Sequence, residues 1–267
     1  MEGGIIMTSQ TKAMSQKDPR AARGHRLRTA VIAGAASALM AAGAFGVTLN
    51  ADAADDPVNA TTFQSAFTSE DKWAGFPSGD YAVRNNVWGS GAGSQSIWAN
   101  SGASWGVTAD HPNTGGVKSY PHSGRDVNRK LSELGHATSN FAVDVPGEGA
   151  HATAYDIWAN GTDYEIMLWM NGTDNIGPIG AKQTTADVGG HTWDVHKGTN
   201  GSNEVFSFVR TSDTNSGSVD LLAVLNWIKD QGWYGDVTVR DVQFGFEITS
   251  SAGGLNFTCN DYSVSFG

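Results

Sequence analysis

The sequence predicts an all-β domain with one α-helix, built as a sandwich, a jelly roll or a barrel. Many short runs are apolar or alternate apolar with polar residues, and Gly, Asn, Asp and Ser separate them. Only one stretch has apolar residues at the three- and four-residue spacing of a helix. No linker and no repeat of 20–50 residues divides the chain after residue 60, so we expect a single domain.

The expected strands follow one another with turn residues between them. They cover residues 81–89, 96–100, 104–110, 141–145, 152–160, 164–171, 192–198, 204–211, 236–248 and 260–266. The helix is expected within residues 218–232, with Ser218 as its N-cap, Asp220 in its first turn and Gly232 after its end. Its apolar positions are Leu221, Val224, Leu225 and Ile228.

The first 53 residues have the three-part order of a secretory signal peptide. A basic segment ending in "KDPRAARGHRLR" precedes the small, apolar run "TAVIAGAASALMAAGAFGVTL", and Ala51-Asp52-Ala53 fits a cleavage site. A membrane anchor is the alternative, since the run is about long enough to span a bilayer, but the cleavage site closes it. We therefore expect a signal peptide at 1–53, a leader at 54–60, a domain at 61–267, and a secreted, extracellular product without a membrane anchor.

Net charge and tryptophan content indicate which class of partner to expect. The segment before residue 54 holds 6 Lys/Arg and 3 Asp/Glu, so the remaining chain has 11 basic and 24 acidic residues and a net charge of 11 − 24 = −13. Such a charge disfavours nucleic acid and anionic membranes as partners and is compatible with a neutral substrate. All nine Trp lie in this part; they either stack on sugar faces or fill the core. The single Cys259 excludes an intrachain disulfide, and we expect it to be a packed thiol.

Two expected strands each carry one glutamate opposite a strongly apolar face, because side chains alternate between the faces of a strand. In "YEIMLWMN", residues 164–171, the second face comprises Glu165, Met167, Trp169 and Asn171. In "VQFGFEI", residues 242–248, Glu247 lies opposite the face of Phe244 and Phe246. Two such strands in one concave sheet would place both glutamates on the same cleft wall.

Two carboxyls on one wall are what glycoside hydrolysis requires, one to attack or activate water and one to protonate the leaving oxygen. A third acid, Asp156 in "AYDIWAN", alternates with Trp158 on another strand. It could share a proton with the nucleophile or tune its pKa. The alternative interpretation of each acid is a solvated outward face or a paired charge.

These strands resemble those of the family 12 glycoside hydrolases, which are secreted, retaining β-1,4-glucanases with a β-jelly-roll fold. "YEIMLWMNGTDNIGPIG" is similar to the nucleophile strand of that family, "VQFGFEI" to its acid/base strand, and "YDIW" to the strand whose acid sits beside the nucleophile. The resemblance runs from about Phe67 to the end of the chain. It implies a nucleophile at Glu165, a proton donor at Glu247 and an assisting acid at Asp156.

The resemblance also implies a sandwich of two antiparallel sheets with a concave cleft and one helix. "KWAGFPSGDYAVRNNVWG" looks like the substrate-binding start of the family, which implies sugar contacts on the non-reducing side. The implied substrate-binding residues are Trp73, Asn86, Trp88, Met167 and Trp169. Many members have an N-terminal disulfide, which this chain cannot form, and "TSSAGG" after Glu247 is less typical.

We therefore expect an exported, monomeric, endo-acting hydrolase that cleaves β-1,4-glucosidic bonds in cellulose-like glucans by a retaining double displacement, without a metal or cofactor. A non-catalytic carbohydrate-binding jelly roll and a xylanase of the related clan are the alternatives. Cellulose, mixed-linkage glucan and xyloglucan all remain candidate substrates. His191 and His196 have no evident third ligand, and the Gly-rich residues 89–94 do not lead into a helix, so neither predicts a metal or phosphate site.

Overall fold

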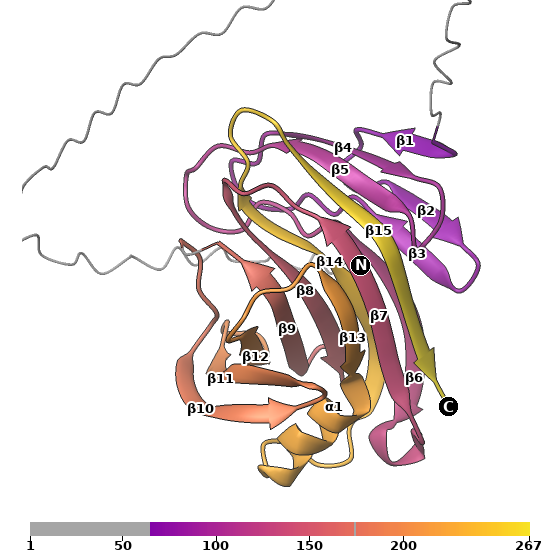
Figure 1. The fold of residues 1–267 in the computed structure, drawn as a ribbon, viewed down its shortest axis with the longest axis vertical. Helices are drawn as coiled ribbons and strands as arrows, with labels where there is room; N and C mark the ends of the chain where they lie inside the picture. Colours follow the sequence, from indigo (N-terminus) through magenta and orange to yellow (C-terminus); the bar gives the residue numbers. More distant parts are fainter. Residues whose placement is uncertain (1–64, 174) are drawn as a thin grey trace, which may run out of the picture. The chain divides into compact units, whose positions relative to one another are not determined.

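Two β-sheets stack on each other in the computed structural model, which describes residues 65–267 except residue 174 (Figure 1). The described part of the chain belongs to one compact unit. The expected signal peptide and leader lie outside the described residues. The expected all-β class with one α-helix is confirmed.

The smaller sheet has six strands in the order β1-β4-β5-β15-β7-β13, and neighbours with assigned register are antiparallel. Its strands are β1 (Phe67–Ser69), β4 (Ser94–Ala99), β5 (Trp105–Asp110), β7 (Ala137–Asp144), β13 (Ser216–Asp220) and β15 (Leu255–Phe266).

The larger sheet has nine strands in the order β10-β11-β12-β9-β8-β14-β6-β3-β2. Its strands are β2 (Gly75–Ser78), β3 (Tyr81–Arg84), β6 (His122–Lys130), β8 (Ala150–Ala159), β9 (Tyr164–Gly172), β10 (Ala181–Val188), β11 (His191–Thr199), β12 (Glu204–Arg210) and β14 (Thr238–Ser250). One pair differs from the antiparallel expectation, because β12 runs parallel to β9.

The hydrophobic core lies between the two sheets. Phe246 of β14 packs on Trp105 of β5 with ring centroids 5.3 Å apart, and Phe244 of β14 packs on Phe141 of β7 at 5.2 Å. All four aromatic side chains are at most 2% exposed. This packing fixes which face of β14 is turned away from the core, and therefore where Glu247 points. Cys259 is free and fully buried, as expected of a packed thiol.

The helix α1 (Leu221–Asp230) begins two residues later than the sequence suggested. Its N-cap is Asp220, whose Oδ1 accepts a hydrogen bond of 2.9 Å from the N–H of Ala223. The expected N-cap, Ser218, lies in β13 and pairs with Asn140, so the prediction of the N-cap was wrong. Strand β13 comes directly before the helix. Gly232 follows the end of the helix with φ +70°, the conformation that glycine favours at this position.

A hairpin sets the register between β8 and β9. Asn160 and Gly161 turn the chain with φ values of +49° and +71°. As a result, Trp158 lies opposite Glu165, and Asp156 lies opposite Met167. Strand β8 also pairs with β14, so it stands between the two strands that carry the glutamates.

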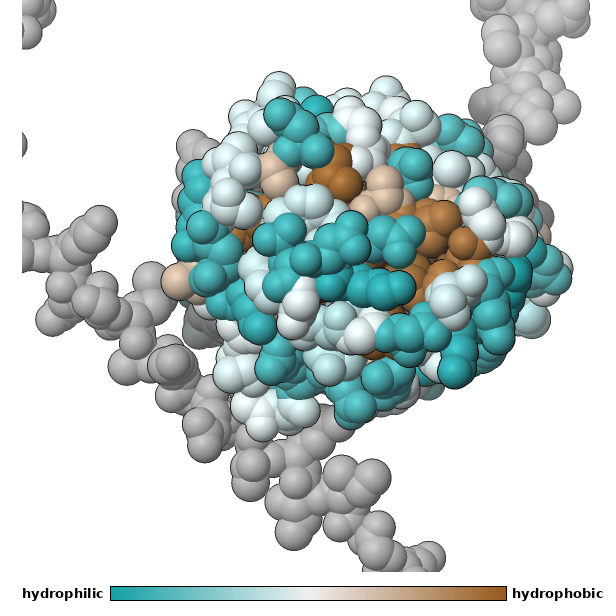
Figure 2. All heavy atoms as spheres, turned by 90° about the horizontal axis from the view of Figure 1, so that it is seen from below, coloured by the Kyte–Doolittle hydropathy of each residue, from teal (hydrophilic) through white to brown (hydrophobic). Residues whose placement is uncertain are grey.

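Hydrophilic side chains predominate on the face seen in Figure 2, where apolar residues form interrupted patches. Between residues 65 and 267, residue 174 aside, no helix is long and apolar enough to cross a membrane.

Candidate active site

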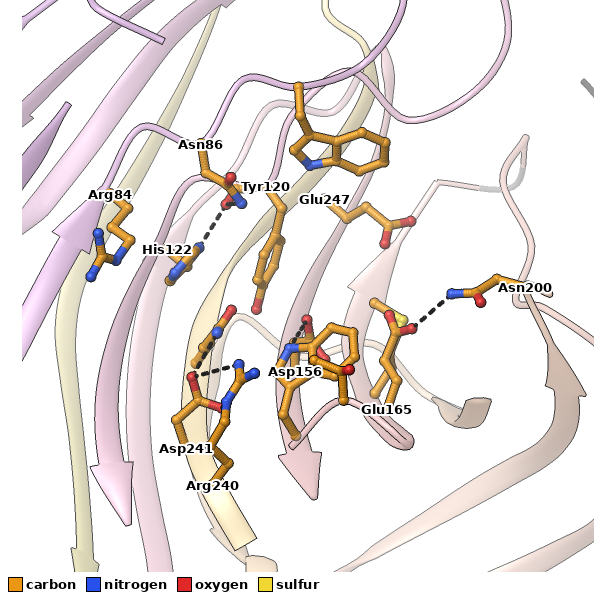
Figure 3. Close-up of a pocket in the computed structure, with 15 residues that line it drawn as sticks. Arg84, Asn86, Tyr120, His122, Asp156, Glu165, Asn200, Arg240, Asp241 and Glu247 are labelled. Atoms are coloured by element: carbon orange, nitrogen blue, oxygen red, sulfur yellow. Dashed lines mark hydrogen bonds and ion pairs between the residues drawn. The ribbon is translucent and has the colours of Figure 1, made fainter. Parts of the chain in front are cut away.

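The two glutamates line one cavity of about 550 Å³ on the face of the nine-stranded sheet that is turned away from the core (Figure 3). The strand faces agree with the sequence analysis: Ile166, Leu168 and Met170 belong to the main core, whereas Met167 packs in a separate cluster with Ala152 and Ala154. The cavity is lined by Arg84, Asn86, Trp88, Tyr120, His122, Asp156, Trp158, Thr162, Glu165, Met167, Asn200, Arg240, Asp241, Gln243 and Glu247.

Glu165 lies on β9 and Glu247 lies on β14, two strands that are not adjacent. The two residues also lie at different positions along the strand direction. Glu165 lies opposite Trp158 of β8, whereas Glu247 lies opposite Ala152, six positions away along the same strand (158 − 152). Both side chains nevertheless line the cavity, and Figure 3 shows the Glu247 side chain extending toward the side of Glu165. The site therefore depends on the arrangement of three adjacent strands and not on a single cross-strand pair.

Two asparagines of the loop between β11 and β12 hold Glu165. The side-chain amide of Asn203 donates to Oε2 of Glu165 at 2.7 Å, and that of Asn200 donates to the same oxygen at 3.4 Å. Burial raises the pKa of Glu165, and the hydrogen bond from Asn203 opposes this effect. Hydrogen bonds to an ionised carboxylate favour the charged form, which is the form that a nucleophile needs.

Asp156 is the most deeply buried of the three acids, and its pKa is raised further from the ordinary value than theirs. Its side chain is 5% exposed, and its Oδ2 accepts a hydrogen bond of 3.1 Å from the indole N–H of Trp158. Burial raises the pKa of Asp156 well above its ordinary value, and the charges of Glu165, Asp241 and Glu247 raise it further. This carboxyl group is therefore protonated under conditions in which an exposed aspartate is ionised.

Glu247 is a partly buried acid whose pKa is raised. Burial raises its pKa to about 7, and the neighbouring charge of Glu165 adds to this effect. No hydrogen bond to a protein donor stabilises the Glu247 carboxylate in the described part of the chain. Two carboxyl groups that differ in hydrogen bonding and burial are the pattern of paired acid and nucleophile sites.

The far wall of the cavity comes from the segment around Tyr120. The hydroxyl of Tyr120 donates to the carbonyl of Ala154 at 3.1 Å, and the carbonyl of Tyr120 accepts from the side chain of Asn86 at 3.1 Å. Asn86 adopts φ +45°, which its short polar side chain tolerates. Trp88 follows and is 54% exposed, so it is free to present a ring face to a ligand.

An ion pair lies next to Trp158 in the lining of the cavity. Arg240 pairs with Asp241 at 3.1 Å, and its guanidinium lies 5.5 Å from the centre of the Trp158 ring. Gln243 donates to Asp241 at 2.9 Å. These contacts fix the indole that holds Asp156.

Six of the eight residues named from the sequence line this cavity: Asn86, Trp88, Asp156, Glu165, Met167 and Glu247. The other two do not. Trp73 is 67% exposed in the turn before β2, and Trp169 lines a separate hollow of about 320 Å³ with Ile176 and Pro178. Sequence reasoning missed Tyr120, His122 and Asn203, whose proximity depends on long-range pairing and not on a local pattern. No cluster of metal-ligating side chains occurs among the residues described.

Comparison with known proteins agrees with this geometry. Residues 79–266 match the model of glycosyl hydrolase family 12. The chain is 33% identical to a probable xyloglucan-specific endo-β-1,4-glucanase A of Aspergillus terreus, over 73% of this chain and 86% of that protein. It is 32% identical to endoglucanase S of Pectobacterium parmentieri, over 68% and 81%.

Solved structures give the same result. The xyloglucanase domain of NopAA, a type three effector from Sinorhizobium fredii solved in complex with cellobiose, is 38% identical, with a TM-score of 0.74 over 76% of this chain and 100% of that chain. The family match covers more than half of the chain and includes both glutamate-bearing strands. The chain belongs to glycosyl hydrolase family 12.

Proposed function

We propose that this protein is an exported endo-β-1,4-glucanase, in which residues 61–267 form the catalytic domain and Glu165 and Glu247 carry out a retaining double displacement. One observation carries the assignment: two carboxyls with different environments face one cavity, where Asn203 favours the charged form of Glu165 and burial keeps the proton on Glu247. A purely carbohydrate-binding jelly roll needs the aromatic side chains but has no use for this pair.

In the first step, the Glu165 carboxylate attacks the anomeric carbon while Glu247 transfers its proton to the leaving glycosidic oxygen. The bond between the anomeric carbon and that oxygen breaks, and a glycosyl ester of Glu165 forms. In the second step, the Glu247 carboxylate takes a proton from water, the water oxygen attacks the anomeric carbon, and Glu165 leaves as a carboxylate. Both residues return to their initial protonation states.

Asp156 assists Glu165 in this scheme. A protonated Asp156 presents no second negative charge to the nucleophile, and it can donate a hydrogen bond to the Glu165 carboxylate. Asn86 and Trp88 hold glucosyl units on the non-reducing side, and Met167 lies beneath the sugar at the cleavage point. Trp73 and Trp169 extend the contacts beyond the cavity.

The substrate class is a β-1,4-linked glucan backbone. The relatives named above include a probable xyloglucan-specific enzyme, an endoglucanase and a domain that binds cellobiose, and all three names fit this backbone. A xylan backbone is the competing substrate, because the related clan uses the same two-glutamate chemistry.

A reducing-sugar assay on carboxymethylcellulose, mixed-linkage β-glucan, xyloglucan and xylan tests the proposal. We expect release of reducing ends from at least one of the three glucans and none from xylan. Glu165→Ala and Glu247→Ala should abolish this release, whereas Glu148→Ala, at an exposed position outside the cavity, should leave it intact. Failure of the wild-type protein on all four polysaccharides would refute the proposed activity. The N-terminal sequence of the exported protein tests the processing site, and we expect it to begin at Ala54.

A further inference from the structure

His122 presents an unused hydrogen-bond acceptor to the cavity. Its Nδ1 lies 2.8 Å from the carbonyl oxygen of Tyr120, and because a carbonyl can only accept, Nδ1 must carry the proton. The ring also stacks on Tyr120, with centroids 5.0 Å apart and planes at 23°. Burial lowers the pKa of His122 to about 4, against the effect of the Tyr120 hydrogen bond and with a contribution from Arg84. The ring is therefore neutral, and its Nε2 carries a lone pair.

Gly124 leaves this lone pair accessible, and Gly245 lets the segment that carries His122 lie close to β14. A Cβ atom at Gly124 would lie 3.9 Å from Nε2 and 3.6 Å from Cδ2 of His122, so a side chain there would cover the nitrogen. A Cβ atom at Gly245 would lie 2.0 Å from the backbone oxygen of Pro121, so only glycine lets the segment carrying His122 lie this close to β14. Within residues 65–267, residue 174 excluded, Nε2 has no hydrogen-bond partner, although His122 is only 5% exposed.

Arg84 supplies the matching donor. It lies opposite His122 in the pairing of β3 with β6 and lines the same cavity. Its guanidinium forms no ion pair with any carboxylate in the described part of the chain. Figure 3 shows Arg84 and His122 on one side of the cavity and Glu165 on the other.

A sugar hydroxyl matches this pair of groups. Its O–H can donate to Nε2, and its oxygen can accept from the guanidinium. The neighbouring polar groups are already engaged, because the Tyr120 hydroxyl donates to Ala154 and the Asn86 amide donates to Tyr120. A carboxylate would be repelled by the Nε2 lone pair, and a sugar oxygen that carries a substituent has no proton to donate to Nε2. Neither group therefore matches this pair.

We propose that His122 and Arg84 form a subsite that binds a free hydroxyl of a glucosyl unit on the non-reducing side of the cleavage point, and so selects a unit that is unsubstituted at that oxygen. This inference rests on the proposed glucanase function and narrows its substrate class. A glucan that binds productively therefore carries no branch on the oxygen that contacts His122 and Arg84.

Binding of cellotetraose to the non-hydrolysing variant Glu165→Ala, followed by calorimetry at pH 6, tests the subsite. His122→Phe keeps a stacking ring but removes the acceptor, while Tyr120 keeps its hydrogen bond from Asn86. We expect this change to weaken binding roughly 3- to 10-fold, the effect of one lost neutral hydrogen bond. Gly124→Ala, which covers Nε2, should weaken binding in the same direction. The control His136→Phe, at an exposed histidine that does not line the cavity, should not.

Two further measurements separate direct contact from a structural role. In the active protein, His122→Phe should raise KM for cello-oligosaccharides with a smaller change in kcat. In the protein with His122 unchanged, the nitrogen-15 resonance of His122 Nε2 should shift when cellotetraose is added. The reason is that this nitrogen becomes less deshielded when its lone pair accepts a hydrogen bond. This measurement decides the question even if His122→Phe fails to fold.

Unchanged cellotetraose affinity in a folded His122→Phe protein, or an Nε2 resonance that ignores saturating cellotetraose, would overturn the subsite. In either case, glucan cleavage by the wild-type protein would leave the proposed function standing. Absence of both cleavage and cellotetraose binding would instead remove the proposed function itself.

Discussion

The indole N–H of Trp158 donates a 3.1 Å hydrogen bond to Oδ2 of Asp156, and this bond indicates which oxygen of Asp156 carries the proton. Because Oδ2 accepts, the proton of the neutral acid is favoured on Oδ1. That oxygen is buried and has no partner among the described residues. Its proton is available to Glu165, the charge that most strongly raises the pKa of Asp156 after burial.

Replacing the donor tests this relationship. Trp158→Phe keeps an aromatic ring for Arg240, which lies 5.5 Å from the ring centre, but leaves Oδ2 unpaired. We expect kcat on glucan to fall roughly 5- to 30-fold, since an unpaired buried acceptor costs about 1–2 kcal/mol and Asp156 loses its fixed orientation. Trp227→Phe on α1, which packs on Phe208 outside the cavity, is the matched control. Equal kcat values for the two variants would mean that the indole N–H has no role in catalysis.

Asp156 should also lower the stability of the folded protein at neutral pH. Its raised pKa means that the native state binds a proton more tightly than the unfolded state does. Stability therefore falls as the pH rises above the unfolded pKa of about 4 and continues to fall until the folded pKa is passed. Asp156→Asn is uncharged at every pH, so we expect it to melt higher than the wild type at pH 7 and near the wild type at pH 4.

Calorimetric melting curves at the two pH values measure this difference. For a domain of this size, each 1 kcal/mol corresponds to about 2–4 °C in Tm. Activity should fall in the same variant, because an amide N–H donates a weaker hydrogen bond to the Glu165 carboxylate than a carboxylic acid O–H does. Asp163→Asn, at an exposed aspartate in the hairpin loop, provides the comparison. A Tm difference that does not grow from pH 4 to pH 7 would contradict the assigned protonation state.

The two glutamates should fail in different ways. Glu165→Ala should be almost inactive on every substrate, and azide should restore activity by replacing the missing carboxylate. Glu247→Ala should be nearly inactive on glucans but should still form the glycosyl-enzyme from aryl glycosides, whose leaving groups need no proton. Full activity of Glu247→Ala on polysaccharide would disprove its role as proton donor.

The pH profile offers a second test of the same roles. Because the pKa of Glu247 is about 7, wild-type activity should decline above neutral pH as the donor loses its proton. The acidic limb should reflect protonation of Glu165. With an aryl glycoside that needs no acid, the decline above pH 7 should disappear from the glycosylation step.

The spacing of the two carboxyl groups predicts the stereochemical outcome. We expect roughly 5–5.5 Å between them in a crystal structure, the separation of retaining enzymes. Proton NMR during hydrolysis should then show the β-anomer of the new reducing end first. A separation near 9 Å, together with the α-anomer as first product, would indicate inversion.

Trp88 should contribute to binding and not to folding. Its ring is 54% exposed, so Trp88→Ala removes little core packing. We expect oligosaccharide binding to weaken by about 1–3 kcal/mol, as for other aromatic stacking contacts, with Tm within a few degrees of the wild type. Calorimetric titration and melting of the same sample test both parts, and unchanged affinity would place the sugar elsewhere.

The sequence determined the features that depend on local alternation. In β9 and β14, every second side chain must enter the core, so the apolar set identified the opposite face and the glutamates on it. The same reasoning placed Asp156, Met167, Asn86 and Trp88, directly or through the family resemblance, and all four line the cavity. Strands with a weak apolar pattern were not predicted from the sequence. In β6 only the first residues are buried, and β10 is largely exposed.

Tertiary structure decided which residues meet. Strand order inserts β8 between the two glutamate strands, and the folded sheet brings Glu165 and Glu247 to one cavity from positions six residues apart along β8. Asn203 is 38 residues from Glu165 in the chain, and their 2.7 Å hydrogen bond exists only because β12 runs parallel to β9. The raised pKa of Glu247 likewise arises from burial and from a charge 82 positions away (247 − 165). Side-chain alternation is fixed by the local backbone, whereas burial, charge proximity and hydrogen-bond partners depend on contacts between strands distant in sequence, and only the folded sheet brings those together.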